Sequence, residues 1–201
     1  MAQDTRERLL DQAEALFAER GFYGVSIAAI ANELGLTKQA LLHHFGSKEK
    51  LYGGVLKRIS SRFMALRELR SGADPIQGLK VYFLALLKKD HLGQHATTVL
   101  MRELLDNKRR ADTAGTWYLK GFLQDLILQV KTAPSWQKAG DAEALAFIYQ
   151  ILGAINYFGI SQPTLTGIFG LDFYRRLDSN YPDQLVNLIE AGLAAGPPTG
   201  N

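Results

Sequence analysis

Two short helical patterns separated by a two-residue turn constrain the fold of this chain more than any other feature. The first pattern places four apolar residues at the spacing of one helix face: Ile27, Ile30, Ala31 and Leu34. Ser26 is suited to cap the start of this helix, and Gly35 can adopt the left-handed conformation that ends it. After Leu36, Thr37 is suited to cap a second helix over residues 38–44. Because a short turn containing glycine holds two helices at a steep angle, the spacing predicts a helix-turn-helix.

An amphipathic helix precedes this pair, over residues 6–19, with Asp4 or Thr5 as its cap and Gly21 as its end. Its apolar face consists of Leu9, Leu10, Ala13, Leu16 and Phe17. We expect the three helices to share one small core, as a domain of residues 1–47. Ser47 then caps a connecting helix that runs to about residue 70, without a Pro-rich or Gly/Ser-rich linker.

The rest of the chain also has helical patterns and no convincing strand, so we expect an all-α fold. We predict a larger domain over residues 48–195 and a disordered tail over 196–201. In the larger domain we expect helices over residues 75–91, 95–107, 112–132, 141–160 and 182–195, with breaks at Pro134, Pro163 and Pro182.

Composition excludes several classes of protein. The chain has no cysteine, which excludes disulfides, thiolate metal sites and a cysteine nucleophile. No signal sequence is evident, and no apolar run reaches the roughly 18 residues of a membrane span, so we expect a cytoplasmic protein. The net charge is only +3, but residues 36–62 hold six cationic side chains against Glu49 alone. This cluster is either a solvated surface or a contact for a polyanion.

The first turn of the second pattern has the chemistry for reading DNA. Thr37, Lys38 and Gln39 are short or polar side chains that can reach base edges. Gln39 can form two hydrogen bonds with adenine, and Lys38 can reach guanine. Lys48, near the start of the connecting helix, can add its charge to that helix's free N–H groups at a phosphate. Together these positions fit the docking of a recognition helix in the major groove.

The stretch from Thr5 to about Val55 resembles the DNA-binding domain of the tetracycline-repressor (TetR) family. The resemblance rests on ALFAERGF at the end of the first helix, the serine cap followed by IAAIANELG, and HHFGSKEKL. It implies a homodimer on a palindromic double-stranded DNA operator, and a helical C-terminal domain that dimerises and holds a small-molecule inducer. It also implies a DNA-binding set of Ser26, Thr37, Lys38, Gln39, His43, His44 and Lys48, with the histidines near the DNA backbone. In many members a tyrosine that bonds a phosphate stands where this chain has Leu42.

Metal binding and catalysis are the alternatives for the histidines. His43 and His44 point about 100° apart on a helix and cannot easily chelate one ion. His91 and His95 have a better spacing, but Gly93 lies between them and no third ligand accompanies them. Nothing resembling a nucleophile, base and orienting group is present. We therefore expect neither an enzyme nor a cofactor or metal site.

The helix predicted over 141–160 is apolar nearly all round, so it must be covered on more than one side. We predict a dimer interface in which it pairs with the last helix across a two-fold axis. The residues of this interface are Ala144, Ile148, Ile151, Ile155, Leu185, Leu188, Ile189 and Gly192. The alternative is a wholly internal helix in a monomer.

Large apolar side chains suggest a ligand pocket in the same domain. The candidates are Met101, Trp117, Tyr118, Phe122, Phe147, Tyr149 and Tyr157. Few charges accompany them, which favours a neutral, apolar or aromatic inducer. Plain core packing is the alternative. The function predicted is a ligand-responsive repressor. A helical small-molecule-binding or interaction protein that has lost DNA binding stays open because of Leu42.

Overall fold

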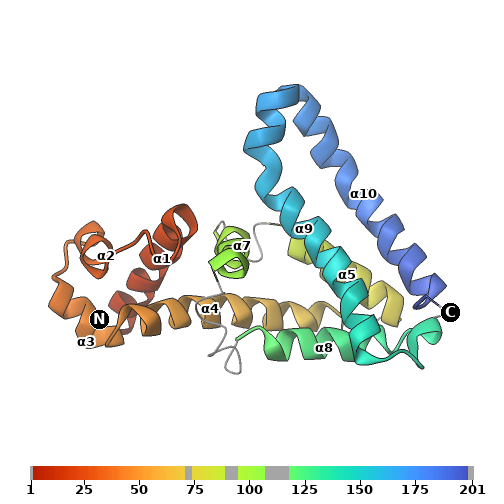
Figure 1. Cartoon of the computed structure of the whole chain (residues 1–201), viewed down its shortest axis with the longest axis horizontal. Helices are drawn as coiled ribbons and strands as arrows, with labels where there is room; N and C mark the ends of the chain where they lie inside the picture. The colour runs from red at the N-terminus through yellow and green to blue at the C-terminus, as the bar shows by residue number, and fades with distance from the viewer. Residues whose placement is uncertain (1, 71–73, 89–94, 107–117, 199–201) are drawn as a thin grey trace. The chain divides into compact units, whose positions relative to one another are not determined.

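The computed structural model describes residues 2–70, 74–88, 95–106 and 118–198. Within these ranges it contains nine α-helices, two 3-10 helices and no strand, which confirms the all-α prediction (Figure 1). Contacts within the chain define two compact units. The first comprises Met1–Arg62 and Leu92–Leu119, and the second comprises Phe63–His91 and Lys120–Asn201. The first unit therefore takes in more of the chain than the predicted domain of residues 1–47.

The first unit contains the predicted helix-turn-helix. It is built from α1 (Ala2–Arg20), α2 (Ile27–Glu33), α3 (Lys38–Phe45), most of α4 (Lys48–Ala65) and α7 (Ala96–Asp106). Ser26 Oγ accepts a hydrogen bond from the Ala29 N–H at 3.0 Å, and Thr37 Oγ1 accepts one from the Ala40 N–H at 3.1 Å. Gly35 has a φ of +65°, in the left-handed region. The caps and turn predicted from the sequence are confirmed.

One helix start in this unit differs from the prediction. Helix α1 begins at Ala2, so Asp4 and Thr5 lie inside its first turns and do not cap it. The sequence before them consists of alanine and glutamine, which are good helix formers and let the helix extend. The core below is as expected: the apolar face of α1 is buried, together with Ile30, Leu41, Phe45, Leu51 and Val55.

The second unit contains the remaining elements in chain order. They are η1 (Leu66–Arg70), α5 (Pro75–Leu87), α8 (Lys120–Val130), η4 (Pro134–Trp136), α9 (Asp141–Phe169) and α10 (Leu171–Ala195). Asp74 accepts a hydrogen bond from the Gln77 N–H at 3.1 Å and caps α5, with Pro75 at the first helical position. Helix α8 is shorter than the predicted 112–132, and residues 112–117 lie outside the described part of the chain.

Two predicted helix breaks are wrong. Pro163 lies inside α9 and Pro182 lies inside α10, so the two helices have 29 and 25 residues and form a long hairpin around Gly170 (Figure 1). A proline removes one backbone hydrogen bond and favours a break or kink. Packing between the helices outweighs this loss: Phe158 stacks on Tyr181 across the hairpin, and Tyr174 and Leu185 are buried on either side of Pro182.

Helix α9 is long and apolar enough to cross a membrane by length and composition alone, contrary to the expectation that no segment reaches that length. This is weak evidence, because the core helix of a soluble protein passes the same test. Six of its side chains are buried inside this chain: Ala144, Phe147, Ile148, Ile151, Ile155 and Phe158. At the other end of the hairpin, Gly196 terminates α10 with a φ of +76°, and residues 199–201 of the predicted tail lie outside the description.

Candidate nucleic-acid interface

The first turn of α3 presents polar side chains to solvent. Thr37, Lys38 and Gln39 are all exposed, whereas Leu41 and Phe45 on the other side of the helix are buried. The Thr37 hydroxyl accepts the N–H bond that caps the helix. Lys38 and Gln39 are the members of this turn whose side-chain ends are available to reach a base edge.

The second half of α3 carries the two histidines. His43 is exposed and His44 is half-buried, and their rings meet edge to face with centroids 5.9 Å apart. Leu42 beside them is half-buried, so this position offers an apolar side chain and no hydroxyl. Among the described residues, no group of three His, Asp or Glu side chains could hold a metal ion. His95 precedes α7, while His91 lies outside the described residues, so that pair stays untested.

Lys48 occupies the first position of α4. Ser47 caps this helix by accepting a hydrogen bond from the Lys50 N–H at 3.2 Å. The Lys48 ammonium lies 4.4 Å from the centroid of the Phe22 ring, over its face. Partial burial lowers the pKa of Lys48, and the nearby Glu49 charge partly opposes this. The cation is therefore held in place by an aromatic face at the start of a helix, where backbone N–H groups also favour an anion.

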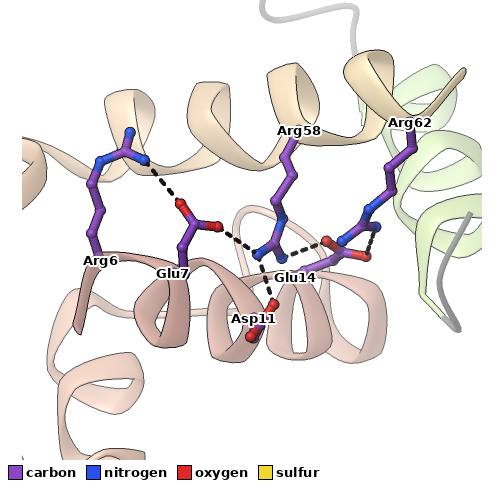
Figure 2. Close-up of polar contacts among 6 residues, drawn as sticks. All are labelled: Arg6, Glu7, Asp11, Glu14, Arg58 and Arg62. Carbon is purple, nitrogen blue, oxygen red and sulfur yellow. Dashed lines mark hydrogen bonds and ion pairs between the residues drawn. The ribbon is translucent and has the colours of Figure 1, made fainter. Parts of the chain in front are cut away.

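Two of the six cationic side chains in residues 36–62 form ion pairs within the first unit. Arg58 on α4 contacts three carboxylates of α1: Asp11 at 2.6 Å, Glu14 at 2.7 Å and Glu7 at 3.6 Å (Figure 2). Arg62 contacts the other oxygen of Glu14 at 2.8 Å. These two arginines pair α4 with α1. Among the described residues, the other cations of the cluster form no ion pair of this kind: Lys38, Lys48, Lys50 and Lys57.

The Glu14 side chain is only 5% exposed, so its charge depends on the two guanidinium groups around it. Burial disfavours the charge on Arg58, but the hydrogen bonds and charges of Glu14 and Asp11 outweigh burial and raise its pKa. The sequence analysis missed this network. Its signal was the placement of Glu7, Asp11 and Glu14 along one side of α1, opposite Arg58 and Arg62 four residues apart on α4.

The residues predicted to line a ligand pocket are spread over the chain. Phe122 stacks on Phe63 with centroids 4.7 Å apart, and Phe147 packs on Trp136 at 5.1 Å. Tyr149 and Tyr157 are 46% and 73% exposed on α9. Met101 and Tyr118 belong to the first unit, and Trp117 lies outside the described residues. The predicted set is thus divided between the two units, and the ligand pocket stays a prediction.

The stripe predicted for the dimer interface lies inside the second unit. Six of its eight residues are at most 4% exposed in the single chain: Ala144, Ile148, Ile151, Ile155, Leu185 and Ile189. Gly192 is half-buried and close to the Phe147 ring, and Leu188 is 49% exposed. A side chain that its own subunit covers has no surface left for a partner. We therefore assign these six residues to the core of the single chain and not to the dimer interface. The exposed apolar residues of α9 are others, among them Tyr149, Tyr157 and Ile160.

Comparison with known proteins supports the interpretation of the first unit. Residues 9–55 match the family model described as "Bacterial regulatory proteins, tetR family". The transcriptional regulator UidR of Escherichia coli K12 is 34% identical over 116 residues, which cover 55% of this chain and 57% of UidR. The chain thus matches little more than half the length of this relative. RutR of the same strain is 24% identical over 169 residues, covering 82% of this chain and 78% of RutR.

Solved structures support the fold over nearly the whole chain. A transcriptional regulator from Streptomyces coelicolor superposes with a TM-score of 0.70 at 18% identity, covering 93% of this chain and 97% of that one. A TetR-like regulator from Rhodococcus sp. RHA1 gives 0.67 at 21% identity, covering 94% and 96%. At these identities the likeness shows the fold alone. The named relatives are transcriptional regulators and not enzymes.

Proposed function

Because this chain belongs to the TetR family of DNA-binding transcriptional regulators, we propose that it is a repressor that binds a palindromic operator as a homodimer. A small apolar or aromatic inducer releases it by favouring a conformation in which the two recognition helices no longer fit successive major grooves, about 34 Å apart. The proposal implies a cytoplasmic protein, because the DNA that carries the operator lies in the cytoplasm.

The exposed first turn of α3 is the observation that carries this proposal. Lys38 and Gln39 reach solvent from a helix whose opposite face is anchored by Leu41 and Phe45, so the helix is rigid and its reading side is free. A glutamine amide distinguishes adenine, and a lysine can reach guanine. Lys48 supplies a phosphate contact, which positions the protein without reading sequence. His43 and His44 lie further along the same helix, toward the DNA backbone.

The homodimer is supported by an exposed apolar face on α9. Tyr149, Gly153, Tyr157 and Ile160 are all exposed and follow one another at intervals of three or four residues, on one side of the helix. Leu188 on α10 is exposed as well. A two-fold axis along this face would bring two hairpins together as a four-helix interface. Changing Tyr157→Glu should convert the dimer to a monomer in light scattering, whereas Leu128→Glu on α8 should not.

Operator binding is tested by footprinting the DNA that flanks the protein's own gene at low salt. We expect a protected palindrome, and its absence would refute the repressor function. Gln39→Ala should reduce discrimination at one base pair by about 1–3 kcal/mol. Lys48→Ala should weaken binding to all DNA sequences and should lower the slope of log affinity against log salt concentration by about one. Lys138→Ala, an exposed lysine of the second unit, is the control and should change neither.

Leu42 favours a second candidate function, a helical ligand-binding protein with weakened DNA binding. The side chain at this position is half-buried and has no hydroxyl to bond a phosphate. If the operator affinity of the wild-type protein is low and Leu42→Tyr restores it, this candidate is favoured. If Leu42→Tyr changes nothing, the missing hydroxyl is unimportant and the repressor function stands.

A further inference from the structure

Helix α7 packs against α1 within the first unit, although the chain from Phe63 to His91 and from Lys120 onward belongs to the second unit. Arg102 on α7 reaches the end of α1: its Nε donates to the Ala18 carbonyl and its Nη2 to the Glu19 carbonyl, both at 2.7 Å. The last carbonyls of a helix lack partners within the helix, and a cation suits that end of the helix dipole. Arg102 therefore fixes α7 to α1.

The neighbouring residue, Glu103, makes a buried contact with α4. The Tyr52 hydroxyl donates to Glu103 Oε2 at 2.8 Å, and the two residues are only 5% and 4% exposed. A hydrogen bond between buried polar groups is costly to break, because neither group can turn to water instead. The orientation of Tyr52 is thus tied to the position of α7.

Tyr52 leads directly to the proposed phosphate contact. Its ring meets the Phe22 ring edge on, with centroids 5.1 Å apart. The face of Phe22 in turn carries the Lys48 ammonium at 4.4 Å. Lys48 and Tyr52 are four residues apart, on successive turns of α4. Glu103, Tyr52, Phe22 and Lys48 form one continuous series of contacts from α7 to the start of α4.

We propose that Glu103 and Tyr52 are positioning residues for DNA binding: they set the Phe22 ring on which the Lys48 ammonium rests when it contacts a phosphate. The inference rests on the proposed function, in which Lys48 binds the DNA backbone.

Salt dependence of operator binding tests this role, because a residue that only stabilises the fold does not change the number of ions released. Lys48→Met should lower the slope of log K against log salt by about 0.9. Tyr52→Phe removes the hydroxyl and keeps the ring, and should lower the slope in the same direction, with a loss of affinity of about twofold to fivefold. Glu103→Met removes the acceptor of the Tyr52 hydroxyl at similar size and should lower the slope as Tyr52→Phe does. Tyr174→Phe, the same change at a buried tyrosine of α10 whose hydroxyl donates to Asp178, is the control and should leave the slope unchanged.

A double-variant cycle decides whether Tyr52 acts through Lys48. In the Lys48→Met background, Tyr52→Phe should have no further effect on affinity. Additive effects, or an unchanged slope in folded Tyr52→Phe, would overturn the inference while leaving the proposed function intact. If Tyr52→Phe fails to fold, Phe22→Leu, which removes the aromatic face, is measured against the same expectations. If the wild-type protein protects no operator, the proposed function fails and this inference fails with it.

Discussion

Two carboxylates of α1 that contact the same arginine should differ widely in their effect on stability. The Asp11 carboxylate accepts a hydrogen bond from Arg58 at 2.6 Å, and the Glu14 carboxylate accepts one at 2.7 Å. The two contacts are therefore equivalent by distance. Their surroundings differ: the Asp11 side chain is 70% exposed and the Glu14 side chain 5% (Figure 2). Replacing each by its amide, Asp11→Asn and Glu14→Gln, removes one charge and keeps the shape.

The expected magnitudes follow from burial. An exposed ion pair contributes about 0–1 kcal/mol, because water and salt screen it, so Asp11→Asn should cost about 0.5 kcal/mol. Removing one partner from a buried pair costs about 3–5 kcal/mol, because the other charge is left without compensation. Glu14 also holds Arg62, whose side chain is 28% exposed, while the amide keeps one acceptor oxygen. We therefore expect about 3 kcal/mol for Glu14→Gln, at the low end of that range.

Urea unfolding followed by circular dichroism measures the difference. With a slope of about 1–3 kcal/mol/M, the midpoint of Glu14→Gln should fall by on the order of 1 M or more, and that of Asp11→Asn by a few tenths. Glu68→Gln, which removes an ion pair exposed on both sides, is the control and should match Asp11→Asn. Equal losses for Asp11 and Glu14 would refute the reasoning, since distance and not burial would then set the strength of the contact.

Four further changes test the packing, the backbone conformation and the burial of particular residues. A Cβ at Gly192 would overlap the Phe147 ring, so Gly192→Ala should cost about 1–3 kcal/mol of stability and lower the melting temperature. A Cβ at Gly167 meets no atom within 4 Å, so Gly167→Ala should raise the melting temperature. Gly35 has a φ of +65°, so Gly35→Ala should destabilise the first unit by about 1 kcal/mol without disturbing a neighbour, as chemical unfolding can show. Burial raises the pKa of the Tyr181 hydroxyl above its usual value of 10.0. The stability that this shift contributes should be fully present below pH 10 and lost above it, because the tyrosine ionises first in the unfolded chain. Tyr181→Phe should therefore reduce the loss of stability at alkaline pH in thermal melts.

Short-range patterns in the sequence predicted the helix-turn-helix closely. Ser26, Thr37 and Ser47 cap helices through bonds to N–H groups three residues away, and Gly35 makes the turn through its own backbone. Interactions of this kind depend on residues next to one another in the chain, so spacing and residue type suffice to predict them. The exposed polar turn of α3 follows from the same periodicity, because the apolar face of the helix fixes which side is left to solvent.

The prolines and the hairpin show where local rules were insufficient. Pro163 and Pro182 predict breaks, but α9 and α10 continue through them because each helix is packed along its length against the other. Ile148 and Ile151 of α9 are fully buried inside the single chain, although periodicity alone could assign them either to the core or to a partner. Sequence identifies an apolar face, but only the neighbouring helix decides what covers it.

The sequence by itself determined the all-α class, the helix-turn-helix and the polar side chains that the first turn of α3 exposes, because each depends on a few consecutive turns of chain. Only the tertiary structure decided how those side chains are held. Arg58 and Glu14 are 44 residues apart, Tyr52 and Glu103 51, and Arg102 reaches across 84 residues to Ala18. No periodicity connects positions so distant, since a helical pattern states that a face is polar or apolar but not which face it meets. The contacts that hold α1, α4 and α7 together therefore become visible only in the tertiary structure.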